Sequence, residues 1–72
     1  MTKEEVRAKL ASLWDAATWS MRFTFCRGIG YDGVASNRLA EEESWSAIDV
    51  ADQNAIVAKA YERQDNLVLL EG

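Results

Sequence analysis

Three glycines stand at the spacing of a nucleotide-binding loop. Gly28, Gly30 and Gly33 match the G-x-G-x-x-G pattern that holds a dinucleotide pyrophosphate where a strand leads into a helix. The residues before the loop, Cys26 and Arg27, do not resemble the end of such a strand, and 72 residues leave no room for the paired βαβ units that a dinucleotide needs. We therefore predict a loop that ends a helix, with a nucleotide-binding module over Gly28–Gly33 as an alternative.

The side chains that most enzymes use are scarce. The chain has no histidine, and Cys26 is its single cysteine, which removes Cys/His and Ser/His catalytic pairs and multi-cysteine zinc sites. Asp49 and Asp52 stand three residues apart, but helix capping explains them without a metal, and no EF-hand pattern surrounds them. We predict no enzymatic activity, no catalytic residue, no metal and no cofactor, and a packed core thiol for Cys26.

Charge is distributed unevenly along the chain. Residues 1–38 carry a net charge of +2 and residues 39–72 a net charge of −6, which gives the total of −4. An acidic surface repels phosphate and attracts basic partners, so we expect a partner protein with a basic surface and disfavour direct nucleic-acid binding. A small DNA-binding regulator is a further alternative, but its recognition helix would carry three glutamates where DNA contacts require Arg or Lys.

Aromatic residues are the remaining signal for a binding surface. The chain contains three Trp, two Tyr and two Phe, and aromatic side chains are enriched where proteins meet. We therefore predict a partner-binding surface with apolar contacts and an acidic rim, made of Trp19, Phe23, Ile29 and Tyr31 and of Glu41, Glu42 and Glu43.

The first segment has the signals of a helix. Thr2 and Glu5 have the spacing of a capping box. Apolar residues then recur at steps of three and four, at Val6, Leu10, Leu13, Trp14, Ala17, Met21 and Phe25. We predict one long helix from Lys3 to Arg27, ended by Gly28 in the left-handed conformation. Residues 19–25 also alternate as a half-buried strand does, so the alternative is an α+β fold in which they pair with residues 67–70.

Two shorter helices are predicted after the glycine turn. Asp32 or Ser36 can cap a helix that runs to about Ser44. Asp49 or Ser46 can cap the next one, which we place from about Val50 to Arg63. The last segment, Leu67–Leu70, is too apolar to stay in water, so it closes the core, pairs as a strand or docks on another chain.

These elements predict a single small all-α domain over residues 1–72, with about three helices. No apolar run approaches the ~20 residues of a membrane span, and the first residues lack a secretory signal, so we expect a cytoplasmic protein. Because the long helix has apolar residues on two stripes, we predict a homodimer formed through it. The favoured function is that of a small non-catalytic regulator or inhibitor that acts by protein–protein interaction and covers a basic surface of its partner.

Overall fold

The computed structural model describes all 72 residues, and every element in it is helical. The elements in chain order are α1 (Lys3–Trp14), α2 (Trp19–Gly28), α3 (Gly33–Ala40), the 3-10 segment η1 (Trp45–Ala47), α4 (Val50–Glu62) and the 3-10 segment η2 (Gln64–Leu70). The predicted all-α class is confirmed. The α+β alternative is wrong, because residues 19–25 belong to α2 and residues 67–70 to η2.

The predicted long helix from Lys3 to Arg27 is also wrong, because the chain turns between α1 and α2. Thr18 has extended backbone angles, φ −79° and ψ 165°, and its hydroxyl oxygen accepts a hydrogen bond from the amide of Met21 at 3.2 Å. A residue in this conformation caps a new helix and cannot continue an old one. No proline or glycine marks this turn. Apolar residues on both sides of it face the same core, so the helical spacing runs through the turn undisturbed.

The end of α2 lies slightly beyond the predicted position. Gly28 is the last residue of the helix, Ile29 is its C-cap, and Gly30 has the left-handed backbone with φ 112°. The amides of Gly30 and Tyr31 donate to carbonyls of the last turn of α2 at 3.2 and 3.0 Å, as in a Schellman motif. The glycine that this helix end requires is therefore Gly30 and not Gly28.

The two later helices form where the sequence predicts them, although Asp49, the N-cap residue of α4, makes no capping hydrogen bond with its side chain. Asp32 caps α3 by accepting a hydrogen bond from the amide of Ala35 at 2.8 Å, although the helix ends at Ala40, before the predicted Ser44. The α4 helix agrees with its prediction to within one residue. The chain's single ion pair, between Arg38 and Asp52 at 2.9 Å, connects α3 to α4.

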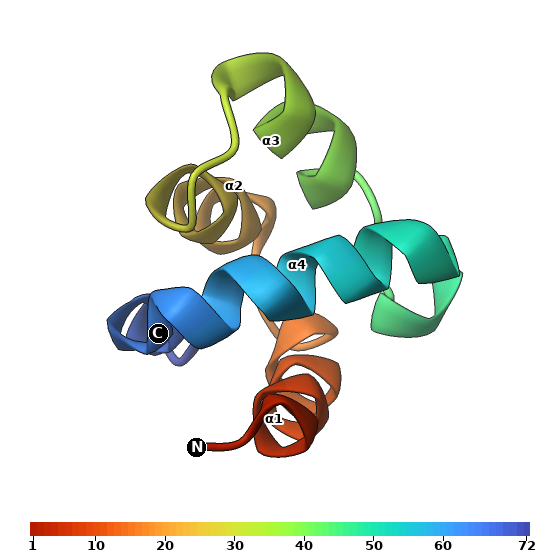
Figure 1. Cartoon of the computed structure of the whole chain (residues 1–72). Helices are drawn as coiled ribbons and strands as arrows, with labels where there is room; N and C mark the ends of the chain where they lie inside the picture. The colour runs from red at the N-terminus through yellow and green to blue at the C-terminus, as the bar shows by residue number, and fades with distance from the viewer.

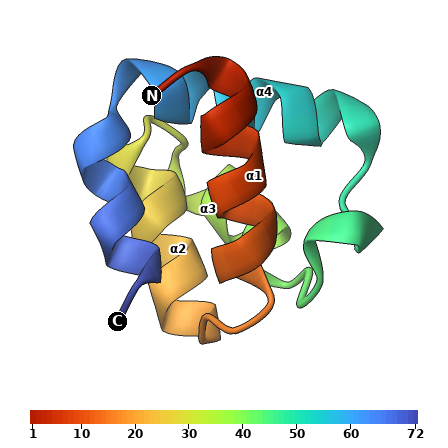
Figure 2. The ribbon, with the colours of Figure 1, turned by 90° about the horizontal axis from the view of Figure 1, so that it is seen from below.

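The helices pack in crossed pairs around a common centre. In Figure 1, α2 and α3 lie on one side of α4, and α1 lies on the other. Figure 2 shows that η2 runs beside α2, and that the turn between α1 and α2 lies at the edge of the molecule opposite α4.

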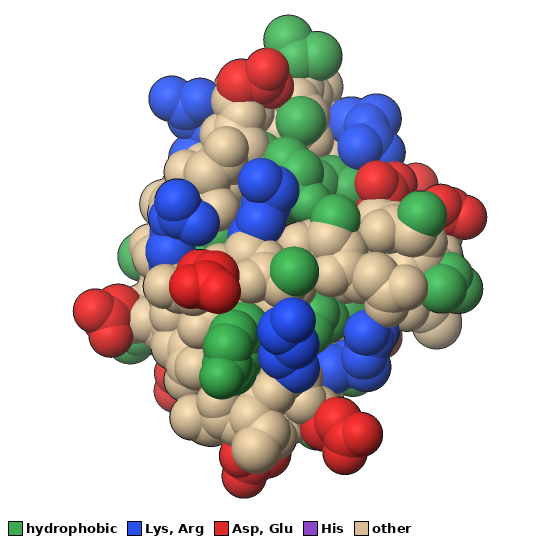
Figure 3. Space-filling view, viewed as in Figure 1, with side chains coloured by type: hydrophobic (Ala, Val, Ile, Leu, Met, Phe, Trp, Pro, Cys, Tyr) green, Lys and Arg blue, Asp and Glu red, His purple; other side chains and the backbone are tan.

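Basic side chains lie on the face that carries α4, with acidic side chains among and around them (Figure 3). The ammonium group of Lys3 lies 5.6 Å from the ring centre of Tyr61 in α4, and Arg7 donates to the side chain of Asn54 at 2.6 Å. Lys59 belongs to α4 itself. Cations from both halves of the sequence therefore share this face.

No membrane-spanning segment is present among the helices, since none combines the required length and apolar character.

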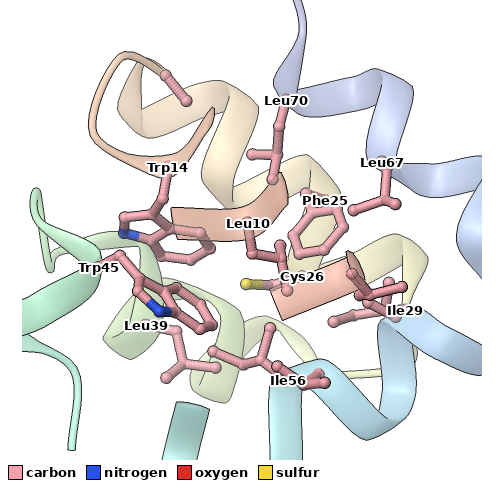
Figure 4. Close-up of a cluster of buried hydrophobic side chains, with 14 of the residues drawn as sticks. Leu10, Trp14, Phe25, Cys26, Ile29, Leu39, Trp45, Ile56, Leu67 and Leu70 are labelled. Carbon is pink, nitrogen blue, oxygen red and sulfur yellow. The ribbon is translucent and has the colours of Figure 1, made fainter. Parts of the chain in front are cut away.

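All elements contribute to a single hydrophobic core (Figure 4). Trp14 is fully buried in it and makes edge-to-face contacts with Phe25 and Trp45, at ring distances of 6.4 and 5.8 Å. Leu67 and Leu70 of η2 are buried in the same core. Of the three roles predicted for the apolar tail, closure of the core is the one that the structure confirms.

Candidate functional site

A surface pocket of about 390 Å³ lies between the α1–α2 turn and the segment that follows α3. Its lining comprises Asp15, Ala17, Thr18, Trp19, Arg22, Glu41 and Glu43. We call it the Trp19 pocket, and we call its three carboxylates, Asp15, Glu41 and Glu43, the acidic rim. The structure thus brings Trp19 together with two of the three predicted glutamates.

Trp19 forms an exposed aromatic wall of this pocket. It is the first residue of α2, and 40% of its surface is accessible to solvent. Its ring stacks on Phe23, one turn further along the helix, at a centroid distance of 5.0 Å and an interplanar angle of 17°. The neighbouring ring restricts the indole and leaves part of its surface free, so Trp19 is pre-positioned for contact with a ligand.

The acidic rim is only weakly engaged with the rest of the chain. Asp15 uses one carboxylate oxygen to accept the amide of Trp45 at 2.8 Å. Glu41 and Glu43 are exposed and take part in no ion pair or side-chain hydrogen bond. The three carboxylates do not converge into a set that could hold a metal ion. They give the margin of the pocket a negative charge, and none of the three carboxylates forms an ion pair.

Arg22 forms the floor of the pocket and connects its two sides. Only 5% of the side chain is exposed. Its Nε donates to the carbonyl of Ala40 at 2.9 Å, and its Nη1 donates to the carbonyl of Ala17 at 2.5 Å. These bonds hold the end of α3 against the α1–α2 turn, so Arg22 determines how far apart the two sides of the pocket lie.

The other predicted contact residues lie outside the Trp19 pocket. Ile29 is fully buried, because it lies on the inward face of α2 with Phe25. Tyr31 is half-buried at the far end of α2, with the ammonium group of Lys59 4.9 Å from its ring centre. Glu42 is exposed but lines a different pocket, because successive residues after the end of α3 point in different directions.

Sequence reasoning missed Asp15 and Arg22. Arg22 occupies a polar position between apolar neighbours, and an arginine in such a position is normally exposed. Its acceptors come from residues 17 and 40, which no local pattern connects. For Asp15, the available signal is an acidic residue three positions before a Thr-Trp pair, which is too weak to predict a pocket.

The glycine loop presents no free amides to a phosphate group at its first half. The amides of Ile29, Gly30 and Tyr31 all donate to carbonyls of α2. A pyrophosphate cradle depends on such amides being available. The arrangement is that of a helix end, in agreement with the prediction that this loop ends a helix.

Comparisons of the chain with protein-family models, with curated proteins and with solved structures find no match. The function therefore has to be argued from the geometry of the Trp19 pocket. An exposed indole beside unpaired carboxylates is suited to holding a cationic group.

Proposed function

We propose that the protein is a small non-catalytic regulator or inhibitor that binds a basic segment of a partner protein at the Trp19 pocket. The observation that carries the proposal is the position of the exposed Trp19 indole beside the acidic rim. A Lys or Arg side chain of the partner would lie against the indole, and its charge would face the carboxylates. While this Lys or Arg is bound in the pocket, the basic surface of the partner could not bind its other ligands.

The physical chemistry of the pocket supports a cationic guest. Tryptophan is the strongest of the aromatic side chains in cation–π contacts. The three carboxylates of the acidic rim line one pocket and form no ion pair, so a guest cation would be attracted by their combined negative charge. The volume of about 390 Å³ lies within the ~300–1,000 Å³ range of ordinary ligand sites, so one long side chain and its backbone can be accommodated.

The residue types in the Trp19 pocket support the non-catalytic part of the proposal. The pocket contains no nucleophilic thiol and no histidine. Cys26 is fully buried, and burial raises the pKa of its thiol to about 12. The pocket therefore lacks the thiol and imidazole groups that most nucleophile–base pairs use, which favours a binding role.

The first test uses a peptide of sequence Gly-Ser-Arg-Ser-Gly, blocked at both ends, and follows the Trp19 indole N–H by NMR. We expect saturable binding at low salt. The double variant Glu41→Gln and Glu43→Gln should bind about five- to tenfold more weakly, because two of the three rim charges are lost. Added salt should weaken binding to the unchanged protein, since the charges are exposed to solvent.

The matched control is the double variant Glu62→Gln and Glu71→Gln. It makes the same change in net charge, but neither residue lines the Trp19 pocket. Binding should stay within about twofold of the unchanged protein. An equal loss of affinity in both double variants would show that the peptide responds to overall charge and not to this pocket.

We also propose that the protein forms a homodimer. Because the predicted long helix is divided into α1 and α2, we place the dimer contact on α2. Trp19 and Phe23 are the aromatic pair that α2 leaves at the surface, and they stack on each other. A second copy covering this pair would compete with the partner for Trp19. In the dimer, the Trp19 surface would be covered and could not bind the partner.

A further inference from the structure

Arg22 carries a buried charge that the chain itself does not balance. The side chain is 5% exposed, and no carboxylate lies within ion-pair distance of it, since the chain's single ion pair is between Arg38 and Asp52. A guanidinium stays charged at any physiological pH. A buried charge without a counter-charge is costly, so this position favours an anionic group supplied from outside.

One nitrogen of Arg22 remains free to bind such a group. Nε and Nη1 are occupied by the carbonyls of Ala40 and Ala17, whereas Nη2 donates to no protein acceptor. This nitrogen is not among the fully buried polar atoms without a partner, and Arg22 lines the Trp19 pocket. Nη2 therefore keeps some accessible surface in a residue that lines the pocket, and its two N–H groups have no acceptor within the chain.

The pocket thus contains charges of both signs at different depths. Its floor has the single positive charge of Arg22, and its margin has the three negative charges of the acidic rim. A simple anion such as phosphate would be repelled by the rim, and a metal ion would be repelled by Arg22. A guest that carries both an anionic and a cationic group satisfies both parts of the site.

We propose that the guest is the C-terminal residue of the partner chain, a Lys or Arg whose free α-carboxylate accepts hydrogen bonds from Nη2 of Arg22. Its side-chain cation then lies against Trp19, within the acidic rim. An Arg or Lys inside a chain offers Arg22 only a neutral carbonyl, whereas a free α-carboxylate also brings the negative charge that the buried guanidinium lacks. This inference rests on the proposed function, because it names the partner group that the Trp19 pocket recognises.

The test compares ligands and leaves the protein unchanged, because substitution of Arg22 would also loosen the α1–α2 turn. The probe is the peptide acetyl-Gly-Ser-Gly-Arg with a free C-terminal carboxylate, and its pair is the same peptide with a C-terminal amide. We expect the free acid to bind about tenfold more tightly, the effect of one additional hydrogen bond between charged groups. The net charge of −4 opposes this result, so a general electrostatic effect would favour the amide instead.

Two further probes complete the experiment. The peptide acetyl-Gly-Ser-Gly-Gln with a free carboxylate should bind at least about tenfold more weakly than the arginine acid, because it lacks the cation. Free L-arginine should also bind more weakly than the peptide, since it adds a positively charged α-amino group close to Arg22.

The outcomes separate this inference from the proposed function. Equal binding of the arginine acid and its amide would overturn the C-terminal assignment and leave the proposed function standing. Free L-arginine binding as tightly as the peptide would overturn the assignment in favour of a free amino acid. Failure of every arginine peptide to bind would overturn both the inference and the proposed function.

Discussion

At the scale of single residues, the position of Cys26 suppresses its chemistry. The side chain is fully buried in the core. Burial raises the pKa of the thiol from 9.0 to about 12, and the positive charge of Arg22 only partly opposes this shift. Because the reactive species is the thiolate, and because reagents cannot reach it, Cys26 acts as a packing residue in the folded protein.

The raised pKa of Cys26 predicts a loss of stability in alkali. Between about pH 9 and 12 the unfolded thiol has lost its proton while the folded one retains it. The unfolded state then binds fewer protons, so the free energy of unfolding falls by up to ~1.4 kcal/mol per pH unit, and it is unaffected below that range. Burial also raises the pKa of Tyr31, which acts in the same direction.

Urea denaturation at pH 7, 9 and 10 measures this effect. In the Cys26→Ala variant, the decrease between pH 9 and 10 should be smaller, because the thiol no longer contributes. An identical decrease in the variant and in the unchanged protein would assign the alkaline loss to other groups, Tyr31 first among them.

At the scale of elements, the turn between α1 and α2 creates the site. In one continuous helix, the carbonyl of Ala17 would accept the amide of Met21. In the structure, that amide donates to the side chain of Thr18, and Arg22 takes the carbonyl of Ala17 instead. The break in the helix therefore supplies one of the two acceptors that hold Arg22 in the floor of the pocket.

The cap at Thr18 is open to a direct test of stability. Thr18→Ala removes the acceptor for the amide of Met21 and should lower the free energy of unfolding by about 1 kcal/mol. Thr24→Ala is the matched control, because Thr24 is exposed within the same helix and caps nothing. Alanine is the better helix former there, so this variant should be neutral or slightly stabilised. Equal urea midpoints for the two variants would contradict the role of Thr18.

At the scale of the whole molecule, charge is separated differently in space than along the chain. Lys59 belongs to the acidic half of the sequence, yet it lies in α4, and Lys3 and Arg7 from the first half also contact α4. The α1–α2 turn, with the Trp19 pocket, lies at the edge opposite α4 (Figure 2). A basic partner of the kind proposed above would be attracted to the acidic rim of that pocket.

The proposed dimer is also tested at this scale, by light scattering over a range of protein concentrations. We expect the mass to approach twice 8.1 kDa as concentration increases. Phe23→Glu should restore the mass of one chain, because a charge would be buried in the contact. Thr24→Glu places the same charge on the neighbouring exposed position and should leave the dimer intact. A single-chain mass at every concentration for the unchanged protein would refute the dimer.

Three of the seven residues that line the Trp19 pocket could be predicted from residue types alone. Trp19, Glu41 and Glu43 were named because exposed aromatics and unpaired acids are typical of binding surfaces, and all three line one pocket. Asp15 and Arg22 could not be named, since their roles depend on partners far away in the sequence, at Trp45 and Ala40. Ile29 resembles a contact residue by type, but the direction of its helix face puts it in the core.

The sequence by itself determined the features that depend on a few neighbouring residues. The capping box at Thr2 and Glu5, the cap at Asp32, the extent of α4 and the apolar stripe of the core all follow from local hydrogen bonds and from helical spacing. The absence of histidine likewise limits the available chemistry without reference to the fold.

Only the tertiary structure decided where the first helix breaks, which arginine is buried and which acidic residues meet. A continuous helix and a broken one present the same spacing of apolar residues, so local energies do not distinguish them. The broken form allows Trp14 and Phe25 to pack against each other in one core, and it frees a carbonyl for Arg22. Burial of apolar surface among distant segments decides between the two forms, because that contribution to folding is large and cannot be read from neighbouring residues.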